Sequence, residues 1–585
     1  MLKKLFAAII ALALLCSLAL PVSASEVVLP SGIGEEAIGE AIEDFVQDHE
    51  DTMAGLSVSV FRKDSVLYRN YFGYADKENR IPVDKNTVME WGSATKLLVW
   101  VSAMQLWEQD KLDLEADIRT YLPKDFLRNL KYDEPITMLH LMNHNAGFED
   151  SIVGMMTADE SQILSLETYL RTIQPRQVFA PGKITAYSNW GVALAGYIVE
   201  RISGMPFYEY AHTHIFDLLD MTHSALNADL SDDNWVKLQR KNLECYTTDA
   251  ERIPNCRHHI IMYPAGMCTS TLEDFETFAM ALLDRESPLF ADPATYDVFV
   301  SPSDYFGDTD IPLNHHGMWA EAYYSTHVIG HGGNTIGCSA RLLLDLGSGV
   351  GMVVMTNQSG EMVFNYDLPE LVFGECGYES LDFTGHMYSC RTTFHGPLKL
   401  NRLLSTYSVT PAGFEGTLYV LSESNGVTKI TATGGGGDYI VTTLPEILLF
   451  SLPVILWAAA LLFCLLSLMV RSIYRLVRKL RHRPVRIPPQ RWATLACILQ
   501  PLAVLPIIPV ILTLTSGNQW PVWVYRAVFG SYLIYAAVFA VLAVHGIVKM
   551  CRQKRWNFFG TATVIALLIS VFNIFYWELG YFWML

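Results

Sequence analysis

The feature that most constrains this chain is its C-terminal part, where four long apolar stretches follow one another. They lie at about 446–470, 494–516, 524–548 and 558–580. Each is close to the roughly 20 residues that a helix needs to cross a bilayer. Basic segments separate the first stretch from the second and the third from the fourth, which by the positive-inside rule makes both of them cytoplasmic loops. The sequence therefore predicts a four-helix transmembrane region over 443–585.

The N-terminus carries an apolar segment of a different kind. Two lysines precede an apolar run that ends at Leu20, and a small-residue cleavage pattern follows before Ser25. This combination is typical of a secretory signal peptide, which we expect at 1–24, although a retained membrane anchor is the alternative. A signal peptide and the two cytoplasmic loops independently place residues 25–442 outside the cytoplasm.

The distribution of charge follows the same division of the chain. The net charge is −18, yet only two acidic residues, Glu446 and Glu578, follow residue 442. An acidic exterior part argues against nucleic acid and other anionic polymers as partners. Small substrates are not restricted by this argument, and the oligomeric state stays open.

Six cysteines fall in the exterior part, where an oxidising compartment permits disulfides. The pairs that lie close in sequence are Cys245–Cys256 and Cys376–Cys390. No spacing of cysteine and histidine resembles a metal site, so we expect neither a metal nor a cofactor.

Strand and helix patterns alternate between residues 25 and 385. A hairpin is predicted at 56–76, strands are predicted within 326–356, and helical patterns occupy the region between them. Strands at both ends with helices between are typical of an α+β sandwich whose terminal strands share one sheet. Residues 386–442 contain possible short strands, but their run of glycines favours a linker.

The segment WGSATKLLVW places Ser93 three residues before Lys96, at the start of a predicted amphipathic helix. Residues i and i+3 share one helix face, so the Lys96 amine reaches the Ser93 hydroxyl. A neutral amine there would accept the proton that a serine must lose to become a nucleophile. The alternative interpretation is a helix cap followed by a solvated lysine.

The segment AYSNWG contributes Tyr187 and Asn189. A phenol held near a cationic lysine has a lowered pKa and can then act as a general base. An asparagine two positions later points to the same side and suits contact with a substrate amide. Packing of this tyrosine in the core is the alternative.

The segment VIGHGGNTIG places His331 at the end of a β-branched strand. Gly332 and Gly333 allow another backbone to approach closely. An amide N–H just after these glycines would pair with the Ser93 amide to bind an oxyanion. The alternative is a tight hairpin turn that requires glycine.

The order Ser-x-x-Lys, Tyr-x-Asn, His-Gly-Gly resembles the serine β-lactamase and penicillin-binding superfamily, and its class C-like branch most closely. The matching blocks are FGYAD (72–76), TVMEWGSATK (87–96), ITMLHLMNHNAGF (136–148), PGKITAYSNWGVALAGYIVERISG (181–204), YPAGMCTSTLEDF (263–275) and GHGGNTIGCSARLLLDLGSGVGMVVMTN (330–357). They occur in the expected order over roughly 35 to 375. The resemblance implies an antiparallel sheet flanked by helices, plus an all-helical subdomain, over residues 25–385.

The resemblance also implies roles for single residues. Ser93 would be the acylated nucleophile, Lys96 and Tyr187 the pair that handles its proton, and Asn189 a contact to the substrate amide. The triad His331-Gly332-Gly333 would line the substrate-binding strand. The backbone amides of Ser93 and Asn334 would form the oxyanion hole.

One departure from the superfamily affects the expected substrate. Many members have lysine where His331 stands, and a neutral histidine is a weaker anchor for a carboxylate. We therefore expect a membrane-anchored exterior serine hydrolase that acts through an acyl-enzyme on peptide or amide substrates, including those with D-amino acids. The alternatives are a penicillin-binding D-Ala-D-Ala carboxypeptidase or β-lactamase, an esterase, and a non-catalytic β-lactam or peptide sensor.

Overall fold

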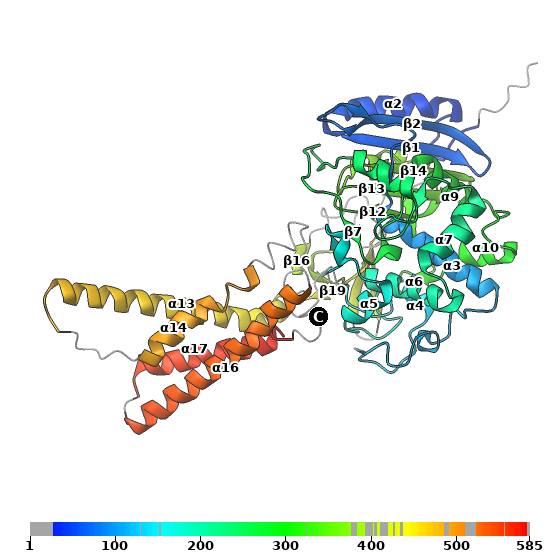
Figure 1. The fold of residues 1–585 in the computed structure, drawn as a ribbon. Helices are drawn as coiled ribbons and strands as arrows, with labels where there is room; N and C mark the ends of the chain where they lie inside the picture. The colour runs from blue at the N-terminus through cyan, green and yellow to red at the C-terminus, as the bar shows by residue number, and fades with distance from the viewer. Residues whose placement is uncertain are drawn as a thin grey trace, which may run out of the picture.

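The computed structural model shows three parts in chain order: an α+β domain, a small second sheet, and a group of long helices that extends away from both (Figure 1). It describes residues 27–581 apart from 129, 151–153, 324–325, 376–382, 392–401, 403–405, 410–418, 425–426, 433–436, 485–490, 509–521 and 555. The predicted signal peptide at 1–24 lies outside the described residues.

A nine-stranded antiparallel sheet forms the centre of the α+β domain. Its strand order is β3-β2-β1-β14-β13-β12-β11-β10-β9. The strands are β1 (Gly55–Arg62), β2 (Ser65–Asp76), β3 (Ile81–Pro82), β9 (Asp304–Tyr305), β10 (Pro312–His315), β11 (Met318–Tyr323), β12 (Thr326–Asn334), β13 (Ser339–Asp345) and β14 (Val350–Thr356). The first long strand pairs with the last, since Leu56 lies opposite Thr356. The predicted sandwich with terminal strands in one sheet is confirmed.

Both faces of this sheet are buried, and β14 shows why. Met352 and Val354 belong to the core beneath α2 (Ile38–Asp48) and α11 (Glu370–Phe373). Val353 and Met355 belong to the larger core on the other face, beneath α9 (Leu272–Leu283). Alternate side chains of a strand point to opposite faces, so a strand with two cores is apolar throughout.

The remaining helices form the second layer of the domain. They are α3 (Lys96–Glu108), α4 (Met138–Met142), α5 (Leu166–Thr172), α6 (Asn189–Ser203), α7 (Phe207–Ala211), α8 (Asn234–Gln239) and α10 (Pro293–Phe299). Helix α3 contacts α6, α7 and α10, and every residue from Lys96 to Leu106 is buried. The prediction of an amphipathic helix here is wrong, because neighbours cover α3 on all sides.

The possible short strands predicted within 386–442 are confirmed, and the described part of this segment is more than a linker. Its strands form a five-stranded antiparallel sheet, here called the accessory sheet, in the order β16-β15-β19-β18-β17. Its strands are β15 (Gly385–Ser389), β16 (Thr406–Val409), β17 (Tyr419–Ser424), β18 (Val427–Ala432) and β19 (Gly437–Thr442). In Figure 1 the labels β16 and β19 lie between the α+β domain and the long helices.

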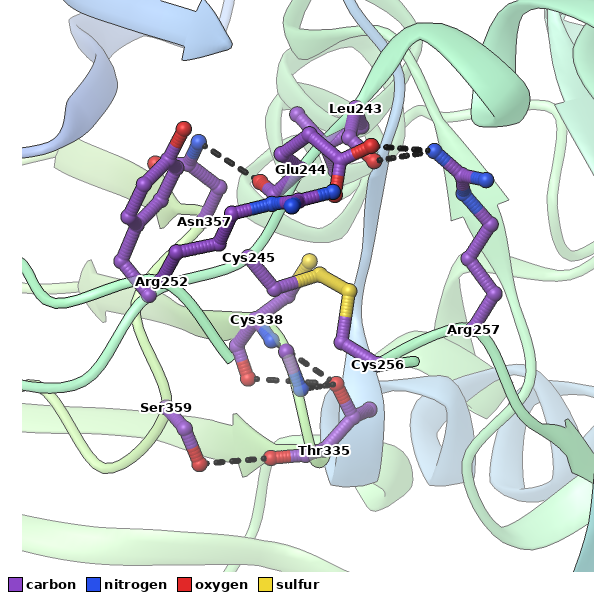
Figure 2. The surroundings of a disulfide bond; sticks show 12 residues. Leu243, Glu244, Cys245, Arg252, Cys256, Arg257, Thr335, Cys338, Asn357 and Ser359 are labelled. Atoms are coloured by element: carbon purple, nitrogen blue, oxygen red, sulfur yellow. Dashed lines mark hydrogen bonds and ion pairs between the residues drawn. A yellow bond between two sulfur atoms is a disulfide. The ribbon is translucent and has the colours of Figure 1, made fainter. Parts of the chain in front are cut away.

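A disulfide joins Cys245 to Cys256, which confirms the first of the two predicted pairs (Figure 2). It supports the turn between β12 and β13, because a Cβ on Gly337 would lie 2.3 Å from Cys245 Sγ. In the same turn the Thr335 hydroxyl accepts a hydrogen bond of 2.9 Å from the Cys338 amide. The second predicted pair, Cys376–Cys390, is not formed, because Cys390 is a free, buried cysteine.

Three helices among the described residues are long and apolar enough to cross a membrane. They are α13 (Leu444–Leu480), the Trp523–Arg552 part of α16 (Val522–Arg552), and α17 (Phe558–Tyr576). They match the first, third and fourth predicted spans. The second predicted span is not confirmed, because α14 (Arg491–Leu502) has only 12 residues and residues 509–521 lie outside the described part. The apolar helices indicate membrane association.

Candidate active site

The nucleophile candidate Ser93 stands in a short 3-10 turn, Gly92–Thr95, that leads directly into α3. This turn brings the Lys96 amine within 2.9 Å of Ser93 Oγ. Lys96 is fully buried, and its Nζ also lies 2.8 Å from Asn189 Oδ1 and 2.5 Å from the carbonyl oxygen of Ala265. The alternative of a cap followed by a solvated lysine is therefore wrong.

Burial decides the protonation state of Lys96. Removal from water lowers the pKa of its amine well below the usual range, and the positive charge of Arg391 acts in the same direction. The negative charge of Asp150 opposes this shift more strongly than Arg391 adds to it, but it is a weaker influence than burial. Burial thus favours the neutral form of the amine, which has a lone pair available for a proton.

Tyr187 lies directly beside this pair, but its phenol does not have the lowered pKa that the sequence suggested. Burial raises the pKa of Tyr187 above the usual value of a phenol, and a hydrogen bond with Ser93 only partly offsets this. The ring stacks on His144 at a centroid distance of 4.3 Å, and the Lys96 amine lies 5.0 Å from its centroid. Tyr187 is therefore a protonated phenol, suited to donate a proton.

Asn189 begins helix α6 and links Lys96 to a carboxylate. Its Oδ1 faces the Lys96 amine, while its backbone N–H and its Nδ2 donate to the two oxygens of Asp150 at 2.9 and 3.0 Å. Asp150 is buried and follows the NAGF segment. The sequence reading missed Asp150, since its distance from Asn189 along the chain shows no recognisable motif.

The strand β12 contacts the Ser93 turn backbone to backbone. A Cβ on Gly333 would lie 1.9 Å from the carbonyl oxygen of Trp91 and 2.6 Å from the Ser93 nitrogen. A Cβ on Gly92 would lie 2.6 Å from the Asn334 nitrogen. Only glycine at both positions allows the two backbones to approach this closely. The approach places the backbone amides of Ser93 and Asn334 near each other in the same cavity.

His331 is buried in β12 and is neutral. Its Nδ1 lies 2.6 Å from the carbonyl oxygen of Gly332, so Nδ1 carries the proton and donates it. Its Nε2 has no hydrogen-bond partner within the described part of the chain. Burial, with a smaller contribution from the Lys96 charge, lowers the pKa of the imidazole to about 3. His331 therefore supplies no positive charge at neutral pH.

These residues surround one cavity of about 310 Å³. Its lining includes seven of the eight predicted site residues, namely Ser93, Tyr187, Asn189, His331, Gly332, Gly333 and Asn334. The eighth, Lys96, lies beneath Ser93. The cavity lining also includes charged residues that were not predicted: Glu321 and the buried Arg341, 3.0 Å apart, and Arg391, which follows strand β15 of the accessory sheet.

Fold and site together place the chain in the class of serine hydrolases. Residues 40–373, more than half of the chain, match the Beta-lactamase family model, and the chain belongs to this family.

Individual relatives share parts of the chain. A beta-lactamase of Pseudomonas fluorescens is 28% identical over 192 residues, which is 33% of this chain and 51% of the relative. A D-aminopeptidase of Gluconobacter oxydans is 30% identical over 185 residues, which is 30% of this chain and 33% of the relative. The chain thus spans about half the length, or less, of these curated relatives.

Among solved structures, the octameric penicillin-binding protein homologue from Pyrococcus abyssi is 19% identical, with a TM-score of 0.48. The match covers 68% of this chain and 99% of that one.

Proposed function

We propose that this chain hydrolyses amide bonds through an acyl-enzyme formed on Ser93. The observation that carries the proposal is the fully buried Lys96 amine, 2.9 Å from Ser93 Oγ, whose burial favours the neutral form. A neutral amine has two N–H groups, which Asn189 Oδ1 and the Ala265 carbonyl accept. Its lone pair then faces the Ser93 hydroxyl, as a general base requires.

Acylation begins when the Ser93 proton moves to Lys96 and Oγ bonds to the substrate carbonyl carbon. The carbonyl electron pair moves onto its oxygen, and the amides of Ser93 and Asn334 stabilise that negative charge. Tyr187 donates its proton to the leaving nitrogen as the C–N bond breaks, and the Lys96 ammonium restores the proton of Tyr187. Water then attacks the ester, gives its proton to the leaving Ser93 Oγ through the same groups, and frees the acid.

Peptides and amides, including those with D-amino acids, are the substrates we propose. The D-aminopeptidase relative supports this class, and a neutral His331 means that the triad itself lacks the cation that the superfamily's triad lysine provides. A penicillin-binding D-Ala-D-Ala carboxypeptidase or β-lactamase is the second candidate, supported by relatives that are beta-lactamases. Esterase activity would use the same acyl-enzyme. A pure sensor is disfavoured, because the catalytic positions are filled.

We also propose that the α+β domain lies outside the cytoplasm and that the long helices anchor it. Basic residues cluster at the C-terminal ends of α13 and α16, as expected for cytoplasmic ends. The Cys245–Cys256 disulfide fits an oxidising compartment on the domain's side. The predicted signal peptide at 1–24 would direct the domain there.

The test uses the full-length chain in detergent, treated with a fluorescent fluorophosphonate and a fluorescent penicillin, with the labelled peptide identified by mass spectrometry. We expect the fluorophosphonate to label Ser93 in the wild type and to leave the Ser93→Ala variant unlabelled. Ser102→Ala, which removes a hydroxyl bonded only within α3, is the matched control and should label normally. Labelling that survives Ser93→Ala would overturn the nucleophile assignment. Trimming of D-Ala-D-Ala peptides with rapid penicillin labelling would favour the second candidate.

A further inference from the structure

The accessory sheet is hydrogen-bonded to the segment that carries Tyr187. The Asp438 amide donates to the Thr185 carbonyl at 2.7 Å, and the Thr185 amide donates to Asp438 Oδ2 at 3.0 Å. Asp438 is fully buried and also binds Lys429 Nζ at 2.8 Å. A buried carboxylate with this many donors fixes the position of the strands around it. The sheet is therefore held in one place relative to the active site.

This docking places Arg391 in the wall of the cavity. Arg391 follows β15 directly, and the amide of the preceding Cys390 donates to the Asp438 carbonyl at 2.9 Å. The Arg391 guanidinium lies over the Tyr187 ring, 4.6 Å from its centroid. Two basic side chains thus lie near one phenol: Lys96, which is buried and favoured in its neutral form, and Arg391, with 37% of its side chain exposed.

The charge of Arg391 is only partly matched by its surroundings. The other arginine of the cavity wall, Arg341, forms an ion pair with Glu321 at 3.0 Å. The Asp150 carboxylate is 3.9 Å from Arg391, and both of its oxygens already accept hydrogen bonds from Asn189. Within the described residues, Arg391 Nε has no hydrogen-bond partner although it is buried. A partly exposed guanidinium whose charge is only partly matched suits a carboxylate.

We propose that Arg391 binds a carboxylate of the substrate close to the scissile amide, so that the accessory sheet completes the active site. The inference rests on the proposed hydrolase function and names the substrate class for it: amides or peptides with a free carboxylate near the cleaved bond. The cation that His331 does not supply comes from another part of the chain, beyond the matched residues 40–373.

A merely structural Arg391 would behave differently. An arginine that only clamps the Tyr187 ring, or only keeps Lys96 neutral, affects reaction with every substrate alike. An arginine that binds a carboxylate affects only substrates that carry one. The discriminating quantity is therefore the ratio of rates for two matched probes.

The experiment measures labelling of Ser93 in the full-length chain by two fluorophosphonates that differ in one group, a free carboxylate in the first and its methyl ester in the second. Arg391→Gln should slow the acidic probe about 10- to 100-fold, the range for lost hydrogen bonds to a charged group. The ester probe should change less than about threefold, and Arg391→Lys should keep part of the preference. Arg285→Gln, at an exposed ion pair with Asp297, is the control and should label like the wild type.

The outcomes separate the inference from the proposed function. Equal slowing of both probes, or no change in their ratio, would overturn carboxylate binding by Arg391 while leaving Ser93 as the nucleophile. Failure of both probes to label Ser93 in the wild type would overturn the hydrolase itself. Thermal unfolding of each variant shows that it is folded, and Arg391→Lys gives a second measure of the ratio if the glutamine variant is not.

Discussion

Lys96 and Arg391 approach the same phenol ring from two different parts of the molecule, and they differ in almost every other respect. Lys96 belongs to the α+β domain, is fully buried, and has a hydrogen-bond partner at each of three contacts. Arg391 follows a strand of the accessory sheet, is partly exposed, and has one donor, Nε, without a hydrogen-bond partner among the described residues. The first arrangement suits proton transfer, and the second suits recognition of a ligand that arrives from solvent.

This difference indicates that the two parts of the chain have different roles. Buried groups with all their hydrogen bonds made hold a fixed geometry, as proton transfer requires. A low dielectric strengthens these hydrogen bonds and raises the free-energy cost of leaving a polar group unpaired. A partly exposed cation, in contrast, can be reached by an anion from solvent without disrupting a buried hydrogen-bond network. Changes in the α+β domain should therefore slow the reaction with every substrate, whereas changes in the accessory sheet should alter the choice among substrates.

The largest effect should follow from Lys96→Met, which keeps the length of the side chain but removes the base. We expect Ser93 labelling by a neutral fluorophosphonate to fall about 1,000-fold, the contribution of a positioned general base. Stopped labelling assays with intact-mass detection measure this. Lys111→Ala, an exposed lysine bonded to Gln109 just beyond α3, should leave the rate unchanged. A fall of less than tenfold in Lys96→Met would assign the base to another group.

The next effect in size concerns Gly333. Gly333→Ala would place a Cβ 1.9 Å from the Trp91 carbonyl, so β12 must move away from the Ser93 turn. Losing one oxyanion donor in this way should slow hydrolysis about 100-fold, and overpacking should cost about 2 kcal/mol of stability. Gly332→Ala tests the geometry, because its Cβ has nothing closer than 3.8 Å and should leave the unfolding temperature unchanged. Equal destabilisation by both variants would contradict the close approach.

The pH dependence should report Lys96 rather than His331. Protonated Lys96 has no lone pair, so kcat/KM should fall about tenfold per pH unit once the pH drops below the lowered pKa of its amine. His331, whose pKa burial lowers to about 3, stays neutral above pH 5 and adds no step near 6.5. A pH series of kcat/KM with wild type and His331→Gln checks this. A step near 6.5 that disappears in His331→Gln would mean that the imidazole is exposed and titrates.

A smaller and more selective effect should follow from Asp438→Ala in the accessory sheet. Lys429 and Thr185 would lose their buried partner, and the strand that positions Arg391 would loosen. We expect the preference for the acidic probe over its ester to fall about tenfold, with the ester rate reduced less than about threefold. Asp438→Asn keeps some of the hydrogen bonds, so its preference for the acidic probe should lie between those of the wild type and Asp438→Ala. Equal loss with both probes would show that the sheet supports Tyr187 rather than recognition.

Sequence reasoning succeeded where the determining contacts are local or follow a motif. The pair Ser93 and Lys96 is set by one turn of backbone, so the spacing alone predicts their contact. Tyr187, His331 and Gly333 are far apart in sequence, and only the order of the blocks identified them together. The remaining features depend on which elements pack against one another, and local patterns do not show this. The apolar periodicity therefore predicted an exposed face on α3, whereas neighbouring elements bury the helix from Lys96 to Leu106.

The features that the sequence did not predict share a physical cause, since each depends on contacts that no local pattern reports. The pKa of Tyr187 depends on burial, which overrides the nearby lysine, and no local pattern reports burial of a polar ring. Arg391 lies after a short strand in a region that its glycines suggested was a linker, and only the pairing of β15 with β19 carries it to the cavity. Likewise, apolar composition over 494–516 does not reveal that α14 ends at Leu502.

The smallest effect should come from the contact between the long helices and the domain. Glu578, just after α17, pairs with Arg176 at 2.5 Å, and Arg176 also pairs with Glu149 at 3.1 Å. Glu149 precedes Asp150, which orients Asn189, so the chain of contacts leads from a membrane helix towards Lys96.

We expect Glu578→Gln to change kcat/KM less than about threefold, because a partly exposed ion pair contributes little. Burial, with a smaller contribution from the negative charge of Glu578, raises the pKa of Glu149 to about 7. Removing that charge should lower the pKa of Glu149, so any small change in activity should lie near neutral pH and vanish at pH 9, where this carboxylate is ionised in both forms. Kinetics of the full-length chain in nanodiscs at both pH values measure this. A loss greater than tenfold at both would mean that the helices shape the active site rather than merely anchor it.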